Sequence, residues 1–173
     1  MTTIKKLSLA SFAIMTLLLT ACSNDDGGSG GGSSLPTYIT GKVDGVSFTT
    51  NLEAAGVATK SGSGASSAII ISCANLTSVA QSEYESIQIA LIGITATGTY
   101  IVNKDTNNTL GYIENHTPNH SWDTGDCSSA SGTITVTSIS ETGIEGTFSF
   151  IGSDDDDCTS TKNVTEGHFK GTF

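Results

Sequence analysis

The sequence predicts an all-β protein, either an antiparallel β-sandwich or a flattened barrel of about ten strands. Two observations predict this class. Only 14% of the 173 residues are charged and 36% are hydrophobic, which is typical of a folded chain. The 20 glycines and the abundant Ser and Thr residues, with few strong helix formers, argue against a helical bundle. The choice between a sandwich and a barrel stays open, because both produce the same alternation of apolar and polar residues.

The alternation is clearest near the C-terminus. In residues 132–138, two apolar side chains fall on one face and three threonines on the other. Residues 143–150 repeat the pattern, and residues 140–143 between them predict a hairpin turn. The same reasoning predicts further strands over residues 38–43, 46–50, 54–60, 68–74, 87–94, 99–102, 110–114 and 164–173.

Two of these segments, 68–73 and 87–94, are apolar on both faces. Such runs are typical of central strands that are covered on both sides, and we expect that arrangement here. Between them, a short helical turn is expected over residues 77–84.

The first 21 residues predict a signal peptide that is cleaved. Lys5 and Lys6 precede a mainly apolar stretch, residues 7–19, which is too short to span a bilayer. The stretch ends in Leu-Thr-Ala-Cys at 19–22, which resembles the bacterial lipobox, in which the cysteine becomes the lipidated first residue of the mature protein. We therefore expect lipid on Cys22. The alternative is an ordinary secretory signal that happens to end near a cysteine.

Residues 22–36 predict a flexible tether ahead of a single β-domain over residues 37–173. The segment 27–34 contains only Gly and Ser, which have no side chains able to bury apolar surface. Ahead of it, Ser-Asn-Asp-Asp at 23–26 resembles the acidic signals that send many Bacteroidota lipoproteins to the outer face of the outer membrane. The alternative is that these residues are only the polar start of a spacer.

The charge of the chain limits its partners. Seven Lys and Arg residues stand against 17 Asp and Glu residues, so the formal net charge is −10. This balance leaves no basic surface for nucleic acid, which we exclude as a partner. The expected partners are the membrane, through the N-terminal lipid, and an unknown protein or small molecule.

Several short segments resemble the motif series of a family of small Bacteroidota outer-membrane lipoproteins of unknown function. They are Gly-Lys-Val-Asp-Gly-Val-Ser-Phe (41–48), Gly-Thr-Tyr (98–100), Gly-Thr-Ile-Thr-Val (132–136), Gly-Thr-Phe-Ser-Phe (146–150) and Val-Thr-Glu-Gly-His-Phe (164–169). The resemblance implies an all-β domain that is lipid-anchored in the outer membrane. Its motifs are strand and turn signatures, so it implies no catalytic or binding residue.

The cysteines predict one disulfide. If Cys22 carries lipid, three thiols remain, and an exported chain can join two of them. The register of the C-terminal hairpin places Cys127 opposite residue 156, two residues from Cys158, and both lie in loops. Cys73 lies in an apolar strand, where a buried thiol is expected. We therefore predict a bridge between Cys127 and Cys158.

The segment 115–126 is a candidate ligand loop. It holds His116, His120, Trp122, Asp123 and Asp126, which could be drawn as a His-plus-carboxylate metal site with an aromatic neighbour. Because a proline between the two histidines prevents the helix that this spacing usually needs, a polar loop is the simpler interpretation. The single Trp either stacks on a sugar ring or plugs one end of the β-domain, and the plug is favoured.

Asp154, Asp155, Asp156 and Asp157 form the densest charge in the chain. Four carboxylates in one loop predict either a solvated turn or weak Ca²⁺ binding, because calcium prefers oxygen ligands. No other cofactor is expected.

Three functions remain from the sequence. The first is a non-catalytic, membrane-anchored lipoprotein that presents its β-domain for binding or envelope architecture. The second is a small-ligand carrier with a cavity inside a barrel, which an empty apolar interior would favour. The third, a metal-dependent hydrolase using the segment 116–126, is the least supported, because no local signature assembles a nucleophile, a base and an orienting group.

Overall fold

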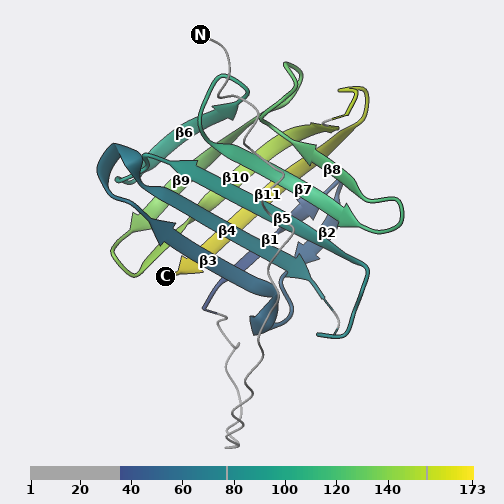
Figure 1. The fold of residues 1–173 in the computed structure, drawn as a ribbon, viewed down its shortest axis with the longest axis horizontal. Coiled ribbons are helices and arrows are strands. Elements are labelled where there is room, and N and C mark those ends of the chain that lie inside the picture. The colour runs from purple at the N-terminus through teal and green to yellow at the C-terminus, as the bar shows by residue number, and fades with distance from the viewer. Residues whose placement is uncertain (1–35, 77, 155) are drawn as a thin grey trace, which may run out of the picture. The chain divides into compact units, whose positions relative to one another are not determined.

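In a computed structural model of the chain, residues 36–76, 78–154 and 156–173 are described, and they form an antiparallel β-domain (Figure 1). The predicted signal peptide and nearly all of the predicted tether lie outside these residues. The elements, in chain order, are β1 (Tyr38–Val43), β2 (Val46–Thr49), the 3-10 helix η1 (Glu53–Ala55), β3 (Gly56–Ser61), the 3-10 helix η2 (Gly64–Ser66), β4 (Ala68–Asn75), β5 (Tyr84–Ile92), β6 (Gly98–Asn103), β7 (Thr109–Asn115), β8 (His120–Asp123), β9 (Ser131–Ile139), β10 (Gly143–Asp154) and β11 (Thr161–Thr172).

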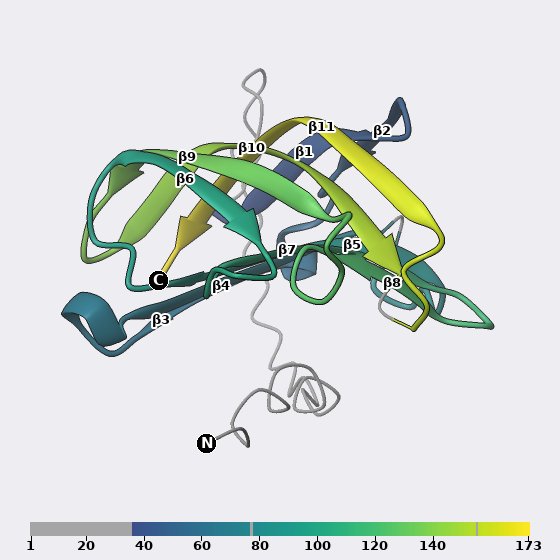
Figure 2. The ribbon, with the colours of Figure 1, turned by 90° about the horizontal axis from the view of Figure 1, so that it is seen from above.

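The strands form one curled sheet. Its hydrogen-bonded order is β2-β1-β11-β10-β8-β7-β5-β4-β3, with β9 on β10 and β6 on β9. Strand β10 pairs with β9 along most of its length and with β8 only at its end, so the sheet turns a corner there. Figure 2 shows the result as two facing layers, with β6, β9, β10, β11, β1 and β2 in one and β3, β4, β5, β7 and β8 in the other. The all-β prediction is confirmed, and the architecture is a half-barrel.

The C-terminal hairpin has the predicted turn and a bulge that the sequence did not reveal. Ile139 pairs with Ile144, as the hairpin register requires. Between Glu145 and Gly146 the register shifts by one residue, which leaves Thr137 without a partner in the ladder. The hydroxyl of Thr137 donates to the carbonyl oxygen of Glu145 at 3.1 Å. The extra residue bends the strand without turning its apolar side chains away from the interior.

The interior between the layers is filled with side chains. Ile71 and Ile89 of one layer and Ile134 and Phe169 of the other are all completely buried in one apolar cluster. A Cβ atom added at Gly171 would lie 2.9 Å from the Cβ of Ala58, which belongs to the opposite layer. The two layers therefore touch at a position where only glycine fits.

Two expectations about the middle of the chain are wrong. The inward residues of β4 and β5 are buried, but their outward residues are only half-buried, so one face of these strands is covered and the other borders solvent. Most of the outward positions hold small or polar residues, which the apolar appearance of the segments concealed. The helical turn expected over residues 77–84 is absent from the described residues 78–84, because Gln81 N donates to Ser78 O in a turn and Tyr84 already begins β5.

The start of the domain is tied to its end. The hydroxyl of Thr172 donates to the carbonyl oxygen of Pro36 at 2.6 Å, and Thr172 N donates to the hydroxyl of Thr37 at 3.2 Å. The domain thus begins at the edge of the predicted tether. Within the described ranges, no helix has the length and apolar character needed to cross a membrane.

Candidate functional site

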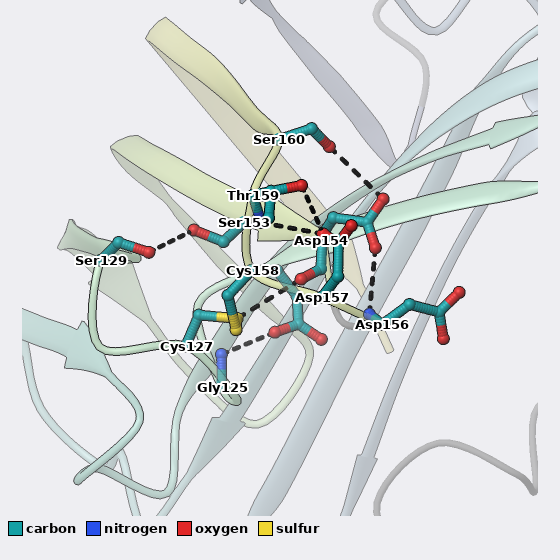
Figure 3. Close-up of a disulfide and its surroundings, with 11 residues drawn as sticks. Gly125, Cys127, Ser129, Ser153, Asp154, Asp156, Asp157, Cys158, Thr159 and Ser160 are labelled. Atoms are coloured by element: carbon teal, nitrogen blue, oxygen red, sulfur yellow. Dashed lines mark hydrogen bonds between the residues drawn. A yellow bond between two sulfur atoms is a disulfide. The ribbon is translucent and has the colours of Figure 1, made fainter.

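A disulfide joins the two polar segments that the sequence singled out (Figure 3). Cys127 follows β8 and Cys158 follows β10, and their Cα atoms are 5.7 Å apart. This is the pair that the hairpin register favours. Beside the bridge, Asp154 of β10 lies opposite Trp122 of β8 in the sheet. The segments 115–126 and 154–158 are therefore neighbours at one end of the domain, which we call the disulfide end.

Trp122 lies in a strand, although the sequence predicted a loop. Strand β8 was missed because it has four residues, and three of them are polar. The side chain is 6% exposed, and its Nε1 donates to the hydroxyl of Ser160 at 2.8 Å. The indole stacks on Tyr112 and His120, with ring centroids 5.9 Å and 5.6 Å away. Trp122 packs into the corner where the sheet turns, in agreement with the plug interpretation. Its ring has no open face on which a sugar could stack.

Lys162 is the residue of this end that sequence reasoning missed. Its Nζ lies 4.9 Å from the centroid of the Trp122 ring and 5.7 Å from that of Tyr112. It is also 2.8 Å from Glu114 Oε1 and 3.6 Å from Asp44 Oδ2. The hydrogen bond with Glu114 and the nearby carboxylates raise the pKa of Lys162 above its usual value. Its partners could not be predicted from the sequence. The chain has 17 Asp and Glu residues and only seven Lys and Arg residues, so each basic residue has many possible acidic partners.

The two histidines face different partners. His116 Nδ1 lies 3.7 Å from Glu83 Oε2, and His120 Nδ1 lies 4.0 Å from Asp154 Oδ2. Both imidazole side chains are partly exposed, at 44% and 47%. The spacing of four residues therefore does not bring them to one point, as it would on a helix.

The two aspartates of the same segment lie in different surroundings. Asp123 is 3% exposed, and its Oδ1 accepts a hydrogen bond from Gly125 N at 2.7 Å. Asp126 is exposed. Among the residues that the structure describes, no three His, Cys, Asp or Glu side chains gather as a metal site would require. The polar-loop interpretation describes residues 116–119 and 124–126, whereas Asn115 ends β7 and residues 120–123 form β8.

Aspartate side chains of the acidic segment accept hydrogen bonds from backbone N–H groups of the same loop. Asp154 Oδ1 accepts from Asp156 N at 3.0 Å, and Asp157 Oδ1 accepts from both the backbone N and the hydroxyl of Thr159 at 2.8 Å (Figure 3). These are Asx turns, in which a side-chain oxygen replaces a backbone acceptor. The hydrogen bonds from Thr159 lower the pKa of Asp157 below its usual value. Asp155, the remaining predicted ligand, lies outside the described residues.

Cys73 is a buried free thiol, as expected from its apolar strand. Its side chain is 0% exposed in β4. Burial is the main cause that raises the pKa of the thiol from 9.0 to about 11. A thiol of this kind is unreactive while the domain is folded.

These features define the class of protein: a disulfide-bonded β half-barrel with a packed interior. Residues 36–171 match a family model described as a domain of unknown function, DUF6252. The chain belongs to this family. No curated protein and no solved structure matches the chain. The match spans β1 to nearly the end of β11, so the family and the observed domain share their boundaries.

Proposed function

We propose that the protein is a non-catalytic lipoprotein, anchored in an outer membrane through lipid on Cys22, that presents its β-domain for binding or envelope architecture. The observation that carries the proposal is the disulfide between Cys127 and Cys158. Disulfides persist in oxidising compartments outside the cytosol, so the bridge supports export of this chain. The lipobox-like sequence at 19–22 supplies the anchor for an exported domain.

A non-catalytic role is supported by what the polar side chains do. Trp122, Asp154 and Asp157 each hold a neighbouring strand or loop through a hydrogen bond. The His and Asp residues that a hydrolase would use point to separate partners. The site is therefore organised for stability, and its chemistry suits a scaffold better than a metal-dependent hydrolase.

The carrier alternative is weakened by the packed interior. A carrier of this size would enclose its ligand between the two layers. Here that space holds the buried apolar cluster, and Gly171 brings the layers into contact. A ligand inside the half-barrel would have to displace these core side chains.

Replacing Cys22 by Ser tests the anchor. The parent should be found in the membrane fraction and should incorporate labelled palmitate, whereas Cys22→Ser should be soluble and unlabelled. Cys73→Ala is the matched control, because it removes a cysteine that carries no lipid in the proposal and should leave both readouts unchanged. A Cys22→Ser protein that remains as membrane-bound as the parent would overturn the proposal.

Surface orientation is tested separately. In the proposal, Asp25 and Asp26 direct the domain to the outer face, so protease added to intact cells should digest it. Replacing both by Asn should keep the protein in the membrane and protect it from protease. Equal digestion of both proteins would show that these two residues are only spacer.

A further inference from the structure

The domain has a surface hollow beside the β9–β10 turn. The disulfide lies at the other end of β10. The hollow has a volume of about 250 Å³. Its walls come from the β3–β4 loop, the β5–β6 loop and the β9–β10 turn, which lie on one side of the domain in both Figure 1 and Figure 2. Its lining includes Lys60, Ser67, Ile94, Ile139, Ser140 and Glu141.

The wall of the hollow is held rigidly. Ser67 N donates to Gly64 O at 3.1 Å, and Ser67 O accepts from Gly93 N at 2.8 Å, so the two loops are joined through one residue. Gly62 and Gly93 have positive φ values of 69° and 73°. At both positions a Cβ would run against the β3–β4 loop, which shows how closely the loops are packed.

Ser67 carries a polar group that the fold leaves unsatisfied. The residue is 2% exposed, and its hydroxyl has no hydrogen-bond partner among the described residues. Burying a hydroxyl without a partner is unfavourable, and such groups in native proteins need an explanation. Ser67 lines the hollow, and a rotation of its side chain would bring the hydroxyl to a ligand bound there, which would then supply the missing partner.

Lys60 supplies a cation at the same place, where its Nζ also lies 5.7 Å from the centroid of the Phe173 ring. Its side chain is 21% exposed, and Nζ donates to Ser140 O at 3.1 Å. Glu141 Oε2 lies 3.9 Å away on a side chain that is 99% exposed, so it is a weak partner in water. An ammonium has three donors, and within the described residues this one donates a hydrogen bond to Ser140 O. An anionic oxygen would satisfy the others.

The remaining lining limits the size and polarity of the ligand. Ile94 and Ile139 provide apolar surface, whereas Ser63, Thr95 and Ser140 provide hydroxyls. The volume is somewhat below the usual range for pockets that hold drug-sized ligands. A small molecule with hydroxyl groups and one carboxylate matches this combination.

We propose that this hollow binds a small hydroxylated carboxylic acid, with its carboxylate on Lys60 and a hydroxyl on Ser67. This proposal does not depend on lipid at Cys22, so the failure of either proposal leaves the other standing.

The test uses D-glucuronate as the probe and D-glucose as its neutral counterpart. Backbone amide shifts of the full-length protein are followed during each titration at constant ionic strength. Glucuronate should produce saturable shifts in residues 60–67, 93–95 and 139–141, and glucose should bind at least tenfold more weakly. Equal binding of the two sugars, unsaturable shifts, or shifts elsewhere in the domain would overturn the proposal.

Three variants complete the test. Lys60→Met should weaken glucuronate binding at least tenfold, whereas Lys104→Met, which removes an exposed lysine outside the hollow, should not. Ser67→Ala should lower the affinity several-fold while leaving the thermal midpoint unchanged or higher, because it removes a buried unsatisfied hydroxyl. Wild-type affinity in either Lys60→Met or Ser67→Ala would overturn the proposed contacts.

Discussion

The ammonium of Lys162 lies over the indole ring of Trp122, with Nζ 4.9 Å from the ring centroid. Lys162 belongs to β11 and Trp122 to β8, two strands that do not pair with each other. The lysine also binds Glu114 at 2.8 Å, so one side chain connects three strands at the disulfide end. A cation here neutralises carboxylates and is attracted to the face of the Trp122 ring.

Lys162→Met should therefore destabilise the domain by about 1 to 2 kcal/mol, the sum expected for a partly buried cation–π contact and its ion pairs. Lys42→Met is the matched control, because Lys42 pairs with Glu166 in an exposed position and should cost less than about 0.5 kcal/mol. Denaturant midpoints of the two variants provide the comparison. Equal losses in both would show that the contact with Trp122 contributes nothing.

Gly146→Ala should be strongly destabilising. A Cβ at this position would lie 2.1 Å from Thr135 O and 2.8 Å from the Phe169 ring, so the backbone and the ring would both have to move. Overpacking of this kind costs about 1 to 3 kcal/mol or more. Gly111→Ala is the control, since its nearest contact would be 3.7 Å and the change should be neutral or slightly stabilising. Thermal melts of the two variants measure the difference.

Removing the disulfide should weaken the domain without changing its fold. The bridge joins residues 31 apart, for which the loss of chain entropy in the unfolded state corresponds to about 3 to 4 kcal/mol. The double variant Cys127→Ala with Cys158→Ala should show this loss in urea denaturation and keep the parent's circular dichroism. A reducing agent should lower the parent's midpoint in the same direction and leave the double variant unaffected.

Cys73 should resist labelling at a pH where ordinary thiols react. The pKa of its thiol is about 11 when folded, against 9.0 ordinarily, so the folded protein holds this proton more tightly than the unfolded chain. Its contribution to stability is complete below about pH 9 and is lost as the pH rises through about 11. Alkylation by iodoacetamide at pH 9 should be slow in buffer and fast in denaturant. Rapid labelling of the folded protein would contradict the buried position.

Millimolar calcium should leave the thermal midpoint unchanged. Asp154 and Asp157 already use a side-chain oxygen in hydrogen bonds to their own loop, and Asp156 is exposed. The comparison protein carries Asn at positions 154 to 157. An increase of the midpoint with calcium in the parent alone would restore the calcium interpretation of this loop.

The sequence predicted most strands because each one depends on a local alternation. The C-terminal hairpin was recognisable from its own residues, and its register pointed to Cys127 and Cys158. Strand β8 was not predicted, because four residues are too few to show an alternation of apolar and polar side chains. Trp122 was therefore placed in a loop.

By itself, the sequence determined that the protein is all-β, that residues 132–150 form a hairpin, and that Cys73 belongs in an apolar strand. Only the tertiary structure decided that Gly171 touches Ala58, that Lys162 covers Trp122 and that Ser67 remains unsatisfied. The physical reason is the range of the interactions. Strand periodicity is set by neighbours in the chain, whereas these contacts join residues that meet only when the sheet curls and its two layers close on each other.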